Sequence, residues 1–172
     1  WLIQPNVVHI PGWSAAIIIL GSWFYLAALW PYLYAINKED VSVVIAVFQI
    51  IPVFGFILGG LFLHETLTPP QMIGSIIIII GALYINYHPD HNLLKVRLPI
   101  FLAMLLSALL FAASFFIFKT IALEASFLTT SFWQYFGFTL LGLILVVFVP
   151  QYRRQFMKVL KANGQGIIRL NI

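Results

Sequence analysis

Gln49 is the first side chain whose chemistry and surroundings favour binding of a small molecule. Pro52 and Phe56 follow it at helical spacing, so the three residues share one side of a helix. Pro52 has no N–H to donate to the Phe48 carbonyl, which kinks the helix and frees that carbonyl. Because apolar surroundings offer an amide side chain no partner, this side faces protein or a wet cavity. Packing against another helix is the simpler explanation, and a substrate-lining surface is the alternative.

Three more polar groups lie well inside apolar stretches. They are the indole N–H groups of Trp23 and Trp133 and the side-chain amide of Gln134. An indole N–H at such a depth needs an acceptor, and either helix packing or a lined pocket would supply one. Core packing is again the simpler explanation. The candidate substrate-lining residues are therefore Trp23, Gln49, Pro52, Trp133 and Gln134.

Charged candidates for chemistry are few. We expect Lys119 to extend to the membrane interface and Glu65 to order a turn between helices. The run HPDH at residues 88–91 offers two imidazoles and a carboxylate, but its proline hinders convergence and no fourth ligand is evident, so no metal site is predicted. No phosphate-binding glycine loop, nucleophile elbow or HExxH helix is present. The sequence therefore predicts no catalytic residue, no cofactor and no enzyme.

Five apolar segments must position these residues, and none of the five contains a charged side chain. The chain is 62% hydrophobic and 8% charged, whereas soluble domains have about 25% charged residues. Residues 43–63 would span about 31 Å as a helix, enough to cross a bilayer. Lipid forces backbone groups to pair internally, and these runs are too long for barrel strands. The prediction is an all-α, polytopic transmembrane helix bundle with spans at Trp13–Ile36, Val43–Leu63, Pro69–Tyr87, Leu98–Phe118 and Phe127–Val149.

Helix-capping patterns mark the connectors. Asp40 is placed to cap the helix that follows it. Thr68, Pro69 and Gln71 have the form of a capping box, in which Gln71 reaches back to the Thr68 amide. Basic and apolar residues alternate over residues 153–161. That alternation favours a short interfacial helix or an ordinary basic loop equally.

The basic residues indicate membrane topology, because they stand between apolar runs and form no nucleic-acid-binding patch. Alternate connectors share a side of the membrane, so eight Lys and Arg residues fall on one side and only Lys119 on the other. The positive-inside rule makes the eight-charge side cytoplasmic. The expected partners are the lipid bilayer and an unidentified small-molecule substrate, with no nucleic acid, and a homo-oligomer stays open. The expected location is the plasma membrane, as a multi-pass protein.

An ordered set of small and turn-forming residues lies between Tyr34 and Tyr87. It includes an Ala at a helix end, a Ser that opens the next helix, a central Pro, a Glu at a turn and two glycines in the last helix. In this order the set resembles the closing portion of an EamA repeat of the drug/metabolite transporter superfamily. Its members are Ala35, Ser42, Pro52, Val53, Phe54, His64, Glu65, Gln71, Gly74 and Gly81.

The fourth and fifth segments resemble the opening of a second such repeat, with Lys119 at the end of its first helix. The resemblance implies ten helices in two repeats of inverted topology. Residues 1–91 would then hold the last three helices of the first repeat. Residues 92–172 would hold the first two of the second repeat plus a basic loop, and the chain would be a fragment. We expect close helix packing at Gly55, Gly59, Gly74 and Gly81. We expect it also in the fourth segment, where small residues recur at helical spacing at Ser107, Ala108, Ala112 and Ser114.

A transporter of small metabolites or drug-like molecules, working by alternating access between the repeats, is the leading hypothesis. A non-transporting scaffold or accessory subunit and a membrane-embedded lipid enzyme are the alternatives. No carboxylate lies within the five segments, so coupling groups would lie elsewhere or transport would be facilitated diffusion or exchange. The usual orientation of the family is the reverse of the one that the charge count predicts.

Overall fold

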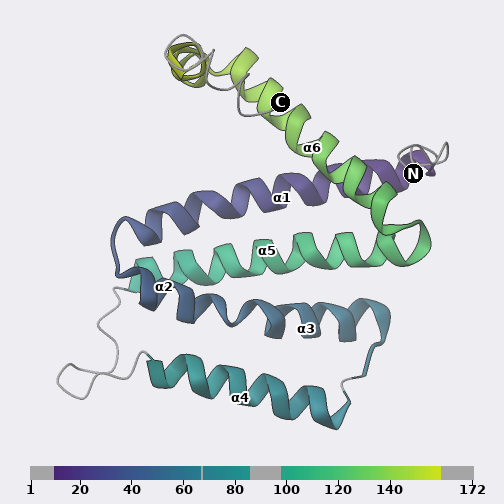
Figure 1. Ribbon diagram of the computed structural model, residues 1–172, viewed down its shortest axis with the longest axis vertical. Coiled ribbons are helices and arrows are strands. Elements are labelled where there is room, and N and C mark those ends of the chain that lie inside the picture. The colour runs from purple at the N-terminus through teal and green to yellow at the C-terminus, as the bar shows by residue number, and fades with distance from the viewer. Residues whose placement is uncertain (1–9, 67, 86–97, 160–172) are drawn as a thin grey trace, which may run out of the picture.

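Helices alone make up the regular structure of the part of the chain that the computed structural model describes, residues 10–66, 68–85 and 98–159. Six of them are labelled in Figure 1. A further helix covers residues 150–159. The predicted all-α class is confirmed. The labelled helices are α1 (Gly12–Ile36), α2 (Val41–Phe48), α3 (Ile51–Leu63), α4 (Pro69–Ile85), α5 (Leu98–Glu124) and α6 (Phe127–Phe148).

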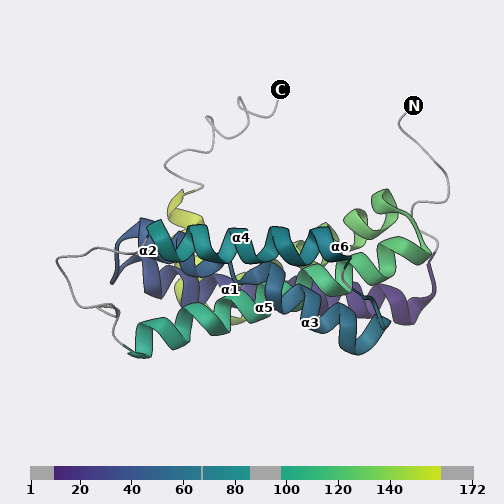
Figure 2. The ribbon, with the colours of Figure 1, turned by 90° about the horizontal axis from the view of Figure 1, so that it is seen from below.

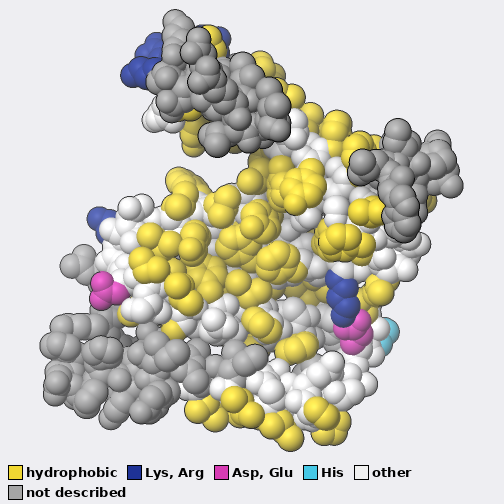
Figure 3. Space-filling view, viewed as in Figure 1, with side chains coloured by type: hydrophobic (Ala, Val, Ile, Leu, Met, Phe, Trp, Pro, Cys, Tyr) yellow, Lys and Arg dark blue, Asp and Glu magenta, His cyan; other side chains and the backbone are white. Residues whose placement is uncertain are grey.

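Four helical stretches among the described residues are long and apolar enough to cross a membrane: α1, α2 with α3, α5 and α6. The predicted third span is helical over the 17 residues of α4, about 25 Å and thus shorter than a hydrocarbon core. The prediction that the fourth segment ends at Phe118 is wrong, because α5 continues to Glu124 and includes Lys119. Figure 3 shows hydrophobic side chains over the middle of the molecule and charged ones toward its ends.

The helices α1, α5, α3 and α4 lie in this order across Figure 1, and α6 crosses α1 at an angle. The view in Figure 2, turned by 90°, shows α1, α3, α4 and α5 running along a common direction. α5 packs against α1 on one side and α3 on the other, and α2 contacts α4. α5 is therefore the central helix of the described bundle, and residues far apart in sequence meet along it.

Small side chains let α5 approach α1 closely. Ser107, Ala108, Ala112 and Ser114 have exposed fractions of 0 to 1%. The Ser107 hydroxyl donates to the Ala28 carbonyl of α1 at 2.7 Å. Close packing was expected here from the spacing of the small residues, and it is confirmed.

The α1–α6 contact also depends on small residues. The Ser22 hydroxyl donates to the Ile18 carbonyl at 2.8 Å within α1 and lies 3.0 Å from the Gln134 carbonyl of α6. Gly137 faces the same hydroxyl so closely that an added Cβ would lie 2.6 Å from it. α6 can cross α1 at this point only because residue 137 has no side chain.

The second predicted span is interrupted in its middle. α2 ends at Phe48 and α3 begins at Ile51, so the predicted kink before Pro52 is confirmed as a break. The amides of Gln49 and Ile50 donate to the carbonyls three residues earlier, at 3.2 and 3.1 Å, which forms a tighter turn. Pro52 then stands in the first turn of α3, where a missing N–H costs nothing.

Two predicted caps have different outcomes. The capping box is confirmed, because the Thr68 amide donates to Oε1 of Gln71 at 2.9 Å before α4. Asp40 occupies the N-cap of α2, but its side chain accepts no capping hydrogen bond. Only the backbone caps α2, since the amides of Val43 and Val44 donate to the Asp40 carbonyl. An exposed Asp side chain is well solvated by water, so the lost bond costs little there.

Candidate functional site

A groove of about 740 Å³ lies between α3, the α3–α4 connector, the start of α4 and the middle of α5. Small-molecule sites in proteins typically have volumes of this order. The lining combines three phenylalanines with a short row of polar and charged groups. The lining residues are Ile51, Pro52, Gly55, Phe56, Glu65, Thr66, Thr68, Gln71, Ala112, Phe115, Phe116 and Lys119.

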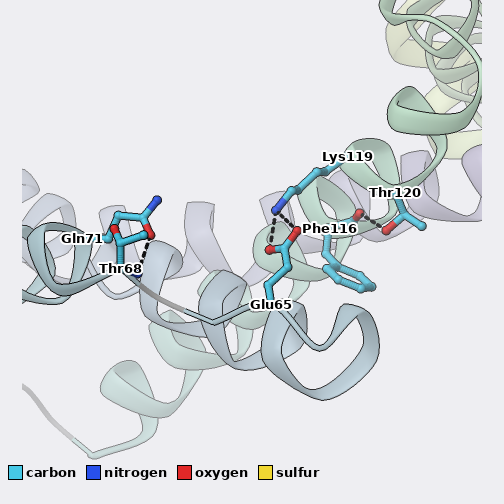
Figure 4. Close-up of polar contacts among 6 residues, drawn as sticks. All are labelled: Glu65, Thr68, Gln71, Phe116, Lys119 and Thr120. Carbon is cyan, nitrogen blue, oxygen red and sulfur yellow. Dashed lines mark hydrogen bonds and ion pairs between the residues drawn. The ribbon is translucent and has the colours of Figure 1, made fainter.

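An ion pair stands at the polar end of this groove. Nζ of Lys119, near the end of α5, lies 2.6 Å from Oε2 and 2.7 Å from Oε1 of Glu65 (Figure 4). The Lys119 and Glu65 side chains are 50% and 43% exposed. Solvent therefore screens the pair, whose net contribution to stability is at most about 1 kcal/mol. A pair of this strength can break and re-form at little cost.

The local backbone explains why Glu65 points back toward α5. His64 adopts the left-handed conformation, with φ 52° and ψ 29°, which few residues other than glycine adopt. This reverses the chain, so that the amides of His64 and Glu65 both donate to the Gly59 carbonyl. The Glu65 carboxylate then lies over Gly59, where an added Cβ would be 2.9 Å from Oε2. The predicted turn-ordering role of Glu65 is thus only part of what it does.

Aromatic side chains form the apolar wall of the groove. Phe56 contributes from α3, and Phe115 and Phe116 contribute from α5. The rings of Phe62 and Phe116 lie 5.7 Å apart and join α3 to α5. A wall of phenylalanines favours ligands with an apolar or aromatic body, while the ion pair and the nearby hydroxyl and amide groups favour a polar end.

A second aromatic cluster holds α5 in place from its other side. Tyr25 of α1 meets Phe111 edge-on, with ring centroids 4.9 Å apart. Tyr32 meets Phe48 of α2 at 5.1 Å, and Phe48 lies 6.0 Å from Phe111. This cluster joins α1, α2 and α5, so the α5 wall of the groove rests on a packed support.

The predicted substrate-lining residues do not gather in one place. Pro52 lines the groove, whereas Gln49 is exposed in the turn before α3 and is not among the lining residues. The Trp23 indole donates to the Gly137 carbonyl at 3.3 Å, which places it between α1 and α6. Its acceptor is thus a backbone group of a neighbouring helix, as the packing explanation expected.

Trp133 and Gln134 both lie on α6, away from the groove. The Gln134 backbone carbonyl lies 3.0 Å from the Ser22 hydroxyl, and Gln134 itself is half-buried. Nε1 of Trp133 is buried without a hydrogen-bond partner among the described residues, and its ring meets those of Phe132 and Phe136 edge-on. The substrate-lining role of these two residues stays a prediction.

The four glycines predicted to serve helix packing have different surroundings. A Cβ added at Gly55 or Gly74 would meet nothing within 4 Å among the described residues, whereas one at Gly59 would meet Glu65. The surroundings of Gly81 lie outside the described residues, as does the HPDH run at residues 88–91. No group of three potential metal-ligating side chains occurs within the described residues.

Sequence reasoning missed the pairing of Glu65 with Lys119. The signal was present, because counting alternate connectors puts the α3–α4 and α5–α6 connectors on the same side of the membrane. Lys119, directly after the fourth apolar segment, is the one Lys or Arg of the sequence on that side. Glu65 lies on the same side, in the connector between the second and third segments. Opposite charges on a membrane side that holds just one other charged residue of the sequence, Glu124, are candidates for an ion pair.

Comparison with known proteins gives two matches. The sequence model of the EamA-like transporter family matches residues 1–87, just over half of the 172-residue chain. An uncharacterized protein of Methanocaldococcus jannaschii is 38% identical over 73 residues, which are 42% of this chain and 48% of that protein. The match thus spans about half the length of that relative. No solved structure matches the chain.

Proposed function

This chain belongs to the EamA-like transporter family, and from that premise we propose that it forms part of a transporter of small metabolites or drug-like molecules. The transporter works by alternating access between two inverted repeats in the plasma membrane. The fifth crossing is made by α4, which is shorter than a hydrocarbon core and therefore stands nearly upright or thins the bilayer locally. The substrate occupies the groove between α3, α4 and α5, with its apolar part against the phenylalanines.

The position of the groove is the observation that supports this proposal. Its α3 and α4 walls come from residues 51–71, which fall in the predicted first repeat. Its α5 wall comes from residues 112–119, which fall in the predicted second repeat. Transporters built from inverted repeats bind substrate at the interface between the repeats. Movement of one wall against the other would open and close such a groove.

The break between α2 and α3 supports the same proposal. Interrupted helices near the bilayer midplane are common at transporter substrate sites, because they leave backbone polar groups free to bind. Here the break stands at residues 49–50, directly before the first groove residues Ile51 and Pro52. A turn at this position lets α3 move relative to α2 without disturbing the packing of α2 on α5.

Filling the groove tests the proposal. In the complete protein reconstituted in proteoliposomes, Gly55→Leu is expected to reduce uptake across a panel of metabolites at least about tenfold, because the new side chain enters a space of the size that a ligand needs. Gly142→Leu is the matched control. Both glycines are helical, and neither has a neighbour within 4 Å of an added Cβ, but only Gly55 lines the groove.

Thermal unfolding of both variants in detergent would show that each folds as the unchanged protein does. Equal uptake by Gly55→Leu and Gly142→Leu would argue against the groove as the transport site. If the unchanged protein gave no flux for any member of the panel, the transporter function itself would be wrong. A scaffold or accessory subunit would then be the better explanation.

A further inference from the structure

The helix at residues 150–159 runs across the spanning helices. α6 ends at Phe148, the extended backbone of its C-cap residue Val149 (φ −109°, ψ 103°) turns the chain, and Pro150 begins the next helix. Figure 1 shows this yellow-green helix nearly end-on, while α1, α3 and α5 lie across the picture. Figure 2, turned by 90°, shows it along its length, crossing the direction of α1 and α5. If those helices span a bilayer, this helix lies parallel to the membrane surface.

Apart from Met157, the apolar and basic side chains of this helix lie on different faces. Tyr152, Phe156 and Val159 stand at helical spacing on one side and are 50, 51 and 54% exposed. Arg154 and Lys158, one turn apart, stand on the opposite side and are exposed. A short helix with an apolar stripe on one face and basic residues on the opposite face is typical of segments that lie in the headgroup region of a bilayer. The described chain covers neither face.

The positive charge of this helix has no counter-charge among the residues that the structure describes. Among the described residues the one ion pair is that of Lys119 with Glu65, so Arg153, Arg154 and Lys158 have no acidic partner there. The sequence has no Asp or Glu after Glu124. Three cations on a helix that lies at the membrane surface would therefore attract anionic groups from outside the chain.

We propose that helix 150–159 is a binding site for anionic phospholipid headgroups. The apolar stripe enters the boundary between headgroups and acyl chains, and Arg153, Arg154 and Lys158 bind lipid phosphates. Arginine suits this role because its planar guanidinium can donate two hydrogen bonds to one phosphate. Each basic residue near an anionic membrane surface contributes roughly fivefold to binding. This site is separate from the groove and does not depend on what the groove binds.

Lipid selectivity tests the proposal. The full chain would be reconstituted in phosphatidylcholine vesicles with spin-labelled phosphatidylglycerol or phosphatidylcholine, and the protein-bound fraction of each probe measured. We expect a preference for phosphatidylglycerol of at least about fivefold, which salt weakens. In the variant Arg153→Gln, Arg154→Gln, Lys158→Gln the bound fractions of the two probes should differ by no more than about twofold. The variant Lys38→Gln, Lys95→Gln, Arg97→Gln removes the same charge from other connectors and should keep it.

Loss of the preference in both triple variants, or in neither, would overturn the proposal.

A second measurement does not depend on charge. Because the chain has no cysteine, a spin label at Phe156→Cys or Arg154→Cys needs no prior substitution. We expect the label at 156 to collide mainly with oxygen, which dissolves in lipid, and the label at 154 mainly with a water-soluble nickel complex. Equal nickel access at both sites would show that the apolar stripe faces water, and would also overturn the proposal.

Discussion

Single side chains determine how closely α5 fits against α1. Ser107 and Ser114 are both buried on α5, seven residues apart, and the sequence predicted the same packing role for the two. Their hydrogen bonding differs in the structure. The Ser107 hydroxyl donates to the Ala28 carbonyl, whereas the Ser114 hydroxyl has no hydrogen-bond partner among the described residues. A buried hydroxyl without a partner is a cost, while a paired one between membrane helices contributes modestly.

Alanine substitution of the two serines should therefore give different results. Ser107→Ala is expected to lower the free energy of unfolding by about 0.6 kcal/mol, the average for hydrogen bonds between membrane helices. Ser114→Ala removes an unpaired hydroxyl and is expected to leave stability unchanged or to raise it. Reversible unfolding in mixed detergent and SDS micelles measures both. A larger loss for Ser114→Ala than for Ser107→Ala would contradict the hydrogen-bond assignment.

The Glu65–Lys119 pair belongs to the same scale. Neither residue was predicted to line a site, because each looked like an ordinary charge at a helix end. Only the left-handed backbone at His64 brings the carboxylate over Gly59 and within 2.6 Å of Nζ. The sequence pattern does not specify this backbone conformation, since histidine is not a residue that normally marks a left-handed position.

Helix packing in this protein is decided by where small residues meet. α6 contacts α1 through Gly137, and a Cβ there would lie 2.6 Å from the Ser22 hydroxyl and 3.1 Å from the Ile19 backbone. The Ile19 backbone cannot rotate away as a side chain can. Gly142, on the same helix, has open space around it among the described residues.

Gly137→Ala is therefore expected to lower the free energy of unfolding by about 1 to 3 kcal/mol, the usual cost of overpacking. Gly142→Ala is the matched control and is expected to be neutral or to stabilise by up to about 1 kcal/mol, because alanine is the better helix former. Thermal unfolding of the two variants in detergent measures the difference. Similar melting temperatures would mean that α6 does not pack on α1 as described.

At the scale of the whole molecule, the connectors divide between two ends. The α1–α2 connector and the helix after α6 lie at one end of the bundle, and the α3–α4 and α5–α6 connectors lie at the other. This agrees with the separation predicted by counting alternate connectors. The orientation in the membrane stays a prediction, in which the end with more basic residues faces the cytoplasm.

Cysteine labelling in sealed vesicles or intact cells tests this topology directly. Lys38→Cys and Arg154→Cys are expected to react with a membrane-impermeant maleimide from one side, and Thr66→Cys and Ala125→Cys from the other. All four positions are exposed, and the chain has no cysteine of its own. Reaction of positions 38 and 154 from opposite sides would contradict the arrangement. Reaction of position 154 from outside the cell would favour the usual family orientation.

The sequence by itself determined the helical class, the apolar segments and the capping box at Thr68. These features depend on the free energy of transferring side chains from water to lipid and on hydrogen bonds between residues close in sequence. Both can be evaluated from a short stretch of sequence without knowing the fold. The break before Pro52 is of the same kind, because a missing N–H acts within one turn.

Only the tertiary structure decided which residues share a site. Of the predicted lining residues, Trp133 and Gln134 lie on α6 and Trp23 contacts it. The groove is instead lined by Pro52, which was predicted, and by Glu65 and Lys119, which were not. Lipid chains are as apolar as leucine, so hydrophobicity does not tell one helix face from another. The choice of partners depends on small residues, backbone turns and side-chain hydrogen bonds that meet across long sequence distances, and these exist only once the helices have packed.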